Sequence, residues 1–216
     1  MKKFLSFTLA LALSVILGAC SSEEPAGEVS SKEETITYES EFGPVEVPEN
    51  PERIVALAYA PNLHALDIEM SGVDQWSKNN PLFEEDLEGV AEVTEAEPES
   101  ILAENPDLII AGANMENLEE LEKIAPTVTY TWGKLNYLEQ QIEIGKLVGK
   151  EDETHAWAED FEKRAADIGS KIKEKHGEDT TVTVIETDGK GFYLFGEAWG
   201  RGTEILYQAM DLKMPE

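Results

Sequence analysis

Three short segments constrain the fold of this chain most strongly. Residues 54–59 and 108–111 are continuous apolar runs, and residues 127–130 alternate threonine with valine and tyrosine. Runs of this kind are typical of strands that are buried on both faces of a parallel sheet. Segments with apolar residues at helical spacing lie between them, and proline or glycine marks their ends. The alternation predicts an α/β layer with a mostly parallel sheet and right-handed connections.

A hairpin and several helices are expected around these strands. Residues 35–38 and 45–47 alternate as strands do, and Gly43-Pro44 favours a turn between them. Apolar residues at helical spacing, with proline at the start and glycine at the end, predict the first connecting helix. The expected connecting helices cover residues 61–72, 97–103 and 118–124.

The pattern changes to long helices after residue 136. Residues 137–148 predict one helix and residues 152–176 predict a second, on which apolar residues recur at steps of three or four. That apolar stripe consists of Trp157, Phe161, Ala165, Ile168 and Ile172. A helix of about 25 residues is about 37 Å long, so it could span a small domain and join two halves.

Strands are expected again after Gly177. Residues 181–185 and 191–195 predict two strands, and Thr203 is suited to cap a helix that runs to Met210. Segments of fewer than about 40 residues rarely bury a core of their own. We therefore expect the start of a second α/β lobe in a chain that is truncated at its C-terminus. The alternative is a complete protein whose last helix packs on the first lobe.

The N-terminus predicts export and lipidation. Two lysines precede residues 4–17, which are almost entirely apolar, and small residues follow them. This run is short for a membrane span, so we expect a signal peptide at residues 1–19. Leu17-Gly18-Ala19-Cys20 resembles a bacterial lipobox, which implies a lipidated Cys20 at the head of a flexible tether, residues 20–34. A secreted protein with a chance cysteine is the alternative.

Charge and residue usage exclude several classes of function. The chain has 45 acidic and 17 basic residues, a net charge of −28, which argues against binding nucleic acid or adsorbing to an anionic membrane. His155 and His176 lie too far apart on one helix to share a metal ion, and His64 is the only other histidine. The sequence has no Gly-x-Ser-x-Gly motif and no phosphate-binding loop, so we do not expect an enzyme.

Five segments form an ordered set of motifs, at residues 51–57, 99–110, 124–128, 144–150 and 195–202. In order and spacing this set resembles the substrate-binding lipoproteins of bacterial iron–siderophore ABC importers, and the last segment resembles the ligand loop of the ferric-hydroxamate members. The resemblance implies a two-lobed, periplasmic-binding-protein-like α/β fold with a long connecting helix and, here, an incomplete second lobe. The expected parts are an N-terminal lobe, connecting helices and the start of a C-terminal lobe, at residues 35–135, 136–177 and 178–216.

The resemblance implies a site that holds iron only within a ferric siderophore, so no cofactor or protein-bound metal is expected. It points to Trp199 for apolar contact area and to Arg201 for a forked donor to ligand oxygens. Ligands of open α/β sheets sit at the carboxyl ends of the strands. The loops there offer four further candidates, for each of which a packing role is the alternative: Tyr59, Asn114, Tyr130 and Trp132.

The resemblance also implies partners. Glu99 matches the acidic residue that docks the first lobe on a basic patch of the permease, although a carboxylate that stabilises a helix start is the alternative. We expect a monomeric, extracytoplasmic binding protein, anchored to the membrane through Cys20, that delivers a ferric siderophore to an ABC importer. Hydroxamates are favoured. The alternatives are ferric citrate, a catecholate, haem or cobalamin as ligand and, further off, a secreted hydrolase.

Overall fold

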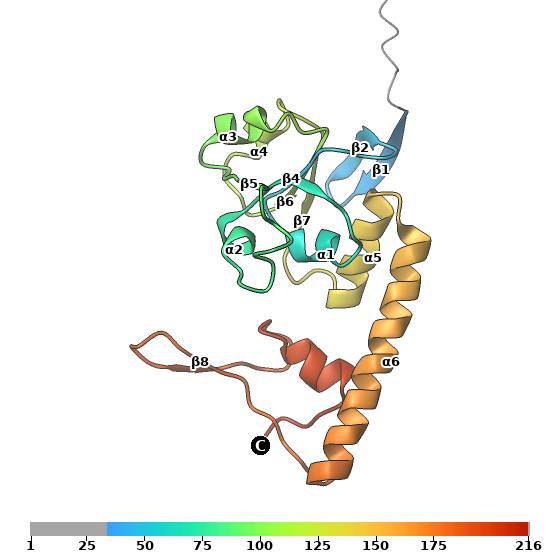
Figure 1. Cartoon of the computed structure of the whole chain (residues 1–216), viewed down its shortest axis with the longest axis vertical. Helices are drawn as coiled ribbons and strands as arrows, with labels where there is room; N and C mark the ends of the chain where they lie inside the picture. The colour runs from blue at the N-terminus through green and yellow to red at the C-terminus, as the bar shows by residue number, and fades with distance from the viewer. Residues whose placement is uncertain (1–33, 216) are drawn as a thin grey trace, which may run out of the picture. The chain divides into compact units, whose positions relative to one another are not determined.

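The computed structural model describes residues 34–215 (Figure 1). The predicted signal peptide, Cys20 and all but the last residue of the predicted tether lie outside this range. Among the residues that the structure describes, no helix is both long and apolar enough to cross a membrane.

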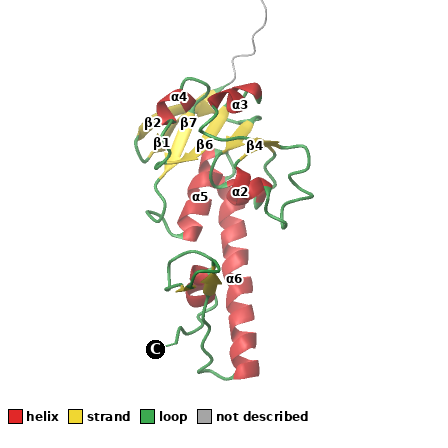
Figure 2. Cartoon of the chain, turned by 90° about the vertical axis from the view of Figure 1, so that its left-hand side faces the viewer, coloured by secondary structure: helices red, strands yellow, loops and turns green. Residues whose placement is uncertain are grey.

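A five-stranded parallel sheet forms the centre of the first part of the chain. Its order is β5-β4-β3-β6-β7, and every neighbouring pair is parallel. Figure 2 labels β4, β6 and β7 of this sheet. The strands are β3 (Ile54–Ala56), β4 (Met70–Val73), β5 (Ala91–Glu92), β6 (Leu108–Gly112) and β7 (Thr127–Tyr130). The three strands expected from apolar or β-branched runs are therefore confirmed as β3, β6 and β7. The first is shorter than expected, because it ends at Ala56 and the chain bends at Leu57 and Ala58 before α1 begins.

Both faces of the sheet are covered, which explains why its central strands are apolar throughout. Ile54 and Ala56 point into a core shared with α1 (Ala60–His64) and α5 (Tyr137–Leu147). Val55 points the other way, into a second core beneath α3 (Pro98–Ala103) and α4 (Leu118–Leu121). Alternate side chains of one strand thus fill two cores, as burial on both faces requires.

The helix expected at residues 61–72 is wrong in its second half. Helix α1 ends at His64, Asp67 adopts a left-handed conformation, and Met70 begins strand β4 beside β3. Aspartate tolerates the left-handed region better than most residues, so the chain can turn there. A Cβ at Gly72 would lie 3.1 Å from Val93, so glycine at this position lets the two segments approach closely.

The expected hairpin consists of β1 (Thr35–Ser40) and β2 (Gly43–Pro48), paired antiparallel. Its turn is centred on Glu41 and Phe42, two residues earlier than the Gly43-Pro44 turn that the sequence predicts. The Ser40 hydroxyl donates to the Gly43 carbonyl and accepts from the Phe42 N–H, which stabilises the earlier turn.

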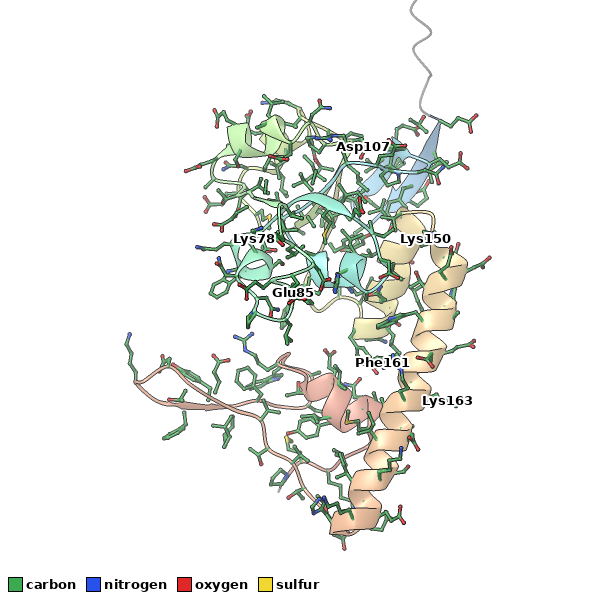
Figure 3. The ribbon with its side chains drawn as sticks, viewed as in Figure 1. Lys78, Glu85, Asp107, Lys150, Phe161 and Lys163 are labelled. Carbon is green, nitrogen blue, oxygen red and sulfur yellow. The ribbon has the colours of Figure 1, made fainter. Side chains whose placement is uncertain are left out.

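Two helices follow the sheet as expected. A capping box of Asn136 and Glu139 begins α5, and α6 covers Glu151–His176. Phe161, marked on α6 in Figure 3, meets Tyr137 of α5 edge to face with ring centroids 5.8 Å apart. The predicted stripe is buried only in part. Ala165 is buried, Trp157, Phe161 and Ile172 are half-buried, and Ile168 is 44% exposed. The other buried residues of α6 are Thr154, Ala158 and Gly169.

A short hairpin and a helical turn lie beyond α6. Strands β8 (Ile185–Thr187) and β9 (Phe192–Leu194) pair antiparallel, and the Ile205–Ala209 turn, η1, is π-helical. The strand predicted at 181–185 starts later, because Val182 donates its N–H to the Lys213 carbonyl and not to β9. The predicted helix at 203–210 is present, but residues 205–209 are π-helical instead of α-helical.

Candidate ligand-binding site

A cavity of about 810 Å³ lies where strands β3, β6 and β7 end. This is the edge at which open α/β sheets bind ligands, and the volume suits a small molecule. Aromatic side chains and short loops line it, including Phe42, Tyr59, Asn114, Met115, Thr131 and Trp132. Three residues predicted from the ends of strands, Tyr59, Asn114 and Trp132, are thus brought together at one cavity.

Tyr59 is held in place by its backbone and by the core beneath it. It adopts a left-handed conformation, with φ of 63°, where β3 gives way to α1. Its ring meets Tyr130 edge to face at 5.5 Å between centroids. Burial and the nearby Glu41 carboxylate raise the pKa of Tyr59, so its hydroxyl stays protonated and can donate to a ligand oxygen.

Tyr130 corrects one expectation about the site. Its side chain is only 2% exposed, and it packs behind Tyr59 without lining the cavity. The Tyr130 hydroxyl lies 3.0 Å from that of Tyr38, which donates to the Glu143 carboxylate at 3.0 Å. Burial raises the pKa of both tyrosines. Tyr130 therefore supports the wall of the cavity from within the core.

The other walls of the cavity come from loops. A Cβ at Gly112 would lie 2.9 Å from Asn114 Oδ1, so glycine leaves room for that amide. Trp132 is 74% exposed, and Phe42 is 66% exposed although both are large and apolar. The sequence reasoning missed Phe42. The one available signal was a large apolar residue next to a turn, where a polar residue is usual.

A second, smaller hollow connects this region with the predicted ligand loop. It has a volume of about 360 Å³ and shares Tyr59 and Trp132 with the first cavity. Ala198, Gly200 and Glu204 also line it. These residues flank Trp199 and Arg201, so the structure brings the loop at 195–202 close to the walls formed by the sheet.

Trp199 and Arg201 are both exposed on this loop. A Cβ at Gly196 would lie 3.2 Å from the Trp199 indole, so glycine allows the ring to lie over the backbone. Arg201 has φ of 54°, and its guanidinium lies 5.8 Å from the centroid of the Phe195 ring. Its Nε donates to the Glu186 carboxylate, which raises the pKa of Arg201. This bond uses Nε alone, so the N–H donors of the two terminal nitrogens are not consumed by Glu186.

Glu99 lies away from the cavity, in the first turn of α3, where it is exposed. Within residues 34–215 there is no group of three or more His, Cys, Asp or Glu side chains that could hold a metal ion.

Comparison with known proteins identifies the family. Residues 54–211 match the model of the family described as periplasmic binding protein. The chain belongs to this family. Periplasmic binding proteins are substrate carriers, in agreement with the expectation of a binding function. The predicted fold class, α/β with a long connecting helix, is confirmed by solved members of the same fold.

Among its relatives, this periplasmic binding protein is 35% identical over 219 residues to the iron(3+)-hydroxamate-binding protein FhuD of Bacillus subtilis (strain 168), covering 98% of this chain and 69% of FhuD. The structure of FhuD from S. pseudintermedius superposes with a TM-score of 0.75 at 38% identity, covering 85% of this chain and 68% of that one. FhuD2 from Staphylococcus aureus with bound ferrioxamine B has a TM-score of 0.72 at 38% identity, covering 76% and 65%.

Proposed function

We propose that this chain is the extracytoplasmic binding component of an ABC importer and that it captures a ferric hydroxamate siderophore. The observation that carries the proposal is the aromatic cavity at the carboxyl edge of the sheet, adjoined by the loop of Trp199 and Arg201. The names of the relatives, which include iron(3+)-hydroxamate-binding protein and a ferrioxamine B complex, support the same ligand class.

The composition of the cavity suits a metal complex whose iron is already saturated. A siderophore supplies all the ligands of its iron, so the protein needs only apolar walls and a few donors to the outer oxygens. Tyr59 and Trp132 offer the walls, the exposed Trp199 offers further apolar area on the adjoining loop, and Arg201 offers two terminal NH2 groups. Iron is therefore cargo in this proposal, and the chain has no resident cofactor and no catalytic activity.

The remaining parts of the proposal concern location and delivery. Lipidation of Cys20 would keep the protein at the outer face of the cell membrane, and the exposed Glu99 on α3 would contact a basic patch of the permease. The protein would act as a monomer and would not bind nucleic acid, given its net charge of −28.

Tryptophan fluorescence of the chain from residue 21 onward tests the ligand class. Ferrioxamine B, ferrichrome, a ferric catecholate, ferric citrate and haem would each be titrated into the protein. Saturable quenching by the hydroxamates at the lowest concentrations, weakened in Trp199→Ala, is the expected result. Tighter binding of one of the other chelates, or no saturable response in a protein that circular dichroism shows to be folded, would contradict the proposal.

A further inference from the structure

Glu41 is a buried carboxylate at the edge of the cavity that the proposed function does not use. It lies in the turn between β1 and β2, and its side chain is only 10% exposed. One carboxylate oxygen, Oε2, accepts from the Thr131 N–H at 3.3 Å and pairs with Lys134 Nζ at 3.2 Å. The other, Oε1, is buried and has no hydrogen-bond partner within residues 34–215.

These contacts of Glu41 contribute little to the stability of the fold. Burial of a carboxylate costs free energy unless both of its oxygens are satisfied, and here one is not. Lys134 is 53% exposed, so water screens its attraction for Glu41. The contacts of Glu41 therefore call for an explanation other than the stability of the fold.

The position of Glu41 supplies that explanation. Phe42 follows Glu41 directly, and Trp132 follows Thr131, so the two aromatic walls of the cavity are the next residues along from the bonded pair. The Lys134 ion pair connects the same turn to the same loop a second time. Two separate contacts thus tie the turn before β2 to the loop after β7.

We propose that Glu41 is a positioning residue, which sets the spacing of Phe42 and Trp132 and so holds the cavity open in the shape that fits a ferric hydroxamate. The inference rests on the proposed function. Both aromatic side chains are largely exposed, so packing alone restrains them little. A wall that is fixed before the ligand arrives loses less conformational entropy on binding, which increases affinity. The Glu41 charge also helps to keep the Tyr59 hydroxyl protonated at the same cavity.

A double-mutant cycle separates this role from a simple loss of stability. Glu41→Gln, Trp132→Ala and the double variant would be made in the full chain, and ferrioxamine B binding would be measured by calorimetry. Glu41→Gln is expected to weaken binding roughly 10-fold, about 1.4 kcal/mol. In the Trp132→Ala background the same substitution should change affinity less than about 2-fold, because Glu41 acts through Trp132. The melting temperature should stay within about 3 °C of wild type.

Glu46→Gln is the matched control, since Glu46 is an exposed acid of the same hairpin whose partner is Thr37. It removes one negative charge without touching the loop at 131–136 and should leave affinity unchanged. If Glu46→Gln lost as much affinity for ferrioxamine B as Glu41→Gln, the effect would come from the change of charge alone. Equal losses from Glu41→Gln with and without Trp132, or no loss at all, would overturn the inference.

A ligand-free measurement keeps the inference distinct from the proposed function. Trp132 can be made the only tryptophan by changing Trp76, Trp157 and Trp199 to phenylalanine. Time-resolved fluorescence anisotropy should then show faster local motion of Trp132 in Glu41→Gln than in its parent. Unchanged motion would overturn the positioning role even if ferrioxamine B binds. If neither ferrioxamine B nor ferrichrome binds the wild type, only the proposed ligand class is contradicted. A change in Trp132 motion would still support the positioning role of Glu41.

Discussion

At the scale of single residues, the site combines exposed side chains with neighbouring residues that contact them or their loops. Tyr59 packs against Tyr130 in the core, Glu41 accepts from the N–H of Thr131 next to Trp132, and Arg201 donates to Glu186 beside the Phe195 ring. Sequence reasoning found the exposed members, because aromatic and arginine side chains after strands and in glycine-rich loops suggest ligand contacts. It could not identify Glu41 and Glu186, the acidic residues that contact the Trp132 loop and Arg201. Glu41 and Glu186 are two of 45 acidic residues, and only the burial of Glu41 and the ion-pair partners of both distinguish them.

The Glu186–Arg201 pair gives the residue-scale prediction. Glu186→Gln should weaken ferrioxamine B binding about 3- to 10-fold. The substitution weakens the contact that holds the Arg201 guanidinium in place, and that guanidinium must be oriented to donate to the ligand oxygens. Stability should change by less than about 1 kcal/mol, since the side chains of Arg201 and Glu186 are 63% and 42% exposed and water screens their attraction. Titration calorimetry and urea unfolding measure the two effects.

Asp179→Asn is a suitable control, because Asp179 forms a comparable exposed pair with Lys213, 2.7 Å away, outside the ligand loop. It should leave affinity unchanged. Tighter binding by Glu186→Gln would mean that Glu186 competes with the ligand for Arg201, contrary to the role assigned to it.

At the scale of elements, close backbone contact holds η1, which follows the ligand loop, against the long helix. Gly169 of α6 lies against the end of η1, and a Cβ there would overlap the carbonyl oxygen of Met210. In an exposed helix interior, Gly→Ala ordinarily stabilises by about 1 kcal/mol. Here Gly169→Ala should instead destabilise the chain by roughly 1–3 kcal/mol through overpacking. It should also weaken ferrioxamine B binding, since η1 follows the loop of Trp199 and Arg201.

Ser170→Ala tests the specificity of that effect on the next residue of α6, where the side chain is exposed and donates only to the Ala166 carbonyl. It should be neutral or slightly stabilising in the same thermal unfolding experiment. A stabilising Gly169→Ala would show that the contact between α6 and η1 is looser than described.

The elements that sequence reasoning predicted correctly are those with a single strong pattern. The runs that became β3 and β6 are buried on both faces and match no amphipathic helix, so their type was clear. Strand β4 was missed because Leu63, Leu66 and Met70 also fit helical spacing, and the left-handed turn at Asp67 has no unambiguous signal. The stripe on α6 was predicted only in part, because hydrophobicity patterns underweight small or polar residues such as Thr154 and Gly169, which are buried, while Ile168 is exposed.

At the scale of the whole molecule, the chain has the fold of a periplasmic binding protein over residues 54–211 and spans 69% of the length of its curated FhuD relative. Its division into lobes at residues 35–135 and 178–216 stays a prediction. Three of the predicted ligand contacts, Tyr59, Asn114 and Trp132, line two adjoining hollows, and the loop that carries Trp199 and Arg201 borders the second hollow. Their proximity could be predicted from the sequence because strand ends share one edge of a parallel sheet, while their role in ligand binding stays a prediction. The contacts between the neighbouring loops could not be predicted from the sequence and are known only from the structure.

The central claim is that a ferric hydroxamate sits between Trp132 and Trp199, and the indole N–H signals of the four tryptophans test it directly. High-spin ferric iron broadens nearby proton resonances, and the gallium complex of the same siderophore provides a diamagnetic reference. With ferrioxamine B, we predict that the Trp132 and Trp199 signals lose the most intensity relative to the gallium complex. Trp157, on α6, and Trp76, on α2 (Gln75–Lys78), should lose less. Equal losses at all four indoles, or the greatest loss at Trp76 or Trp157, would contradict the account.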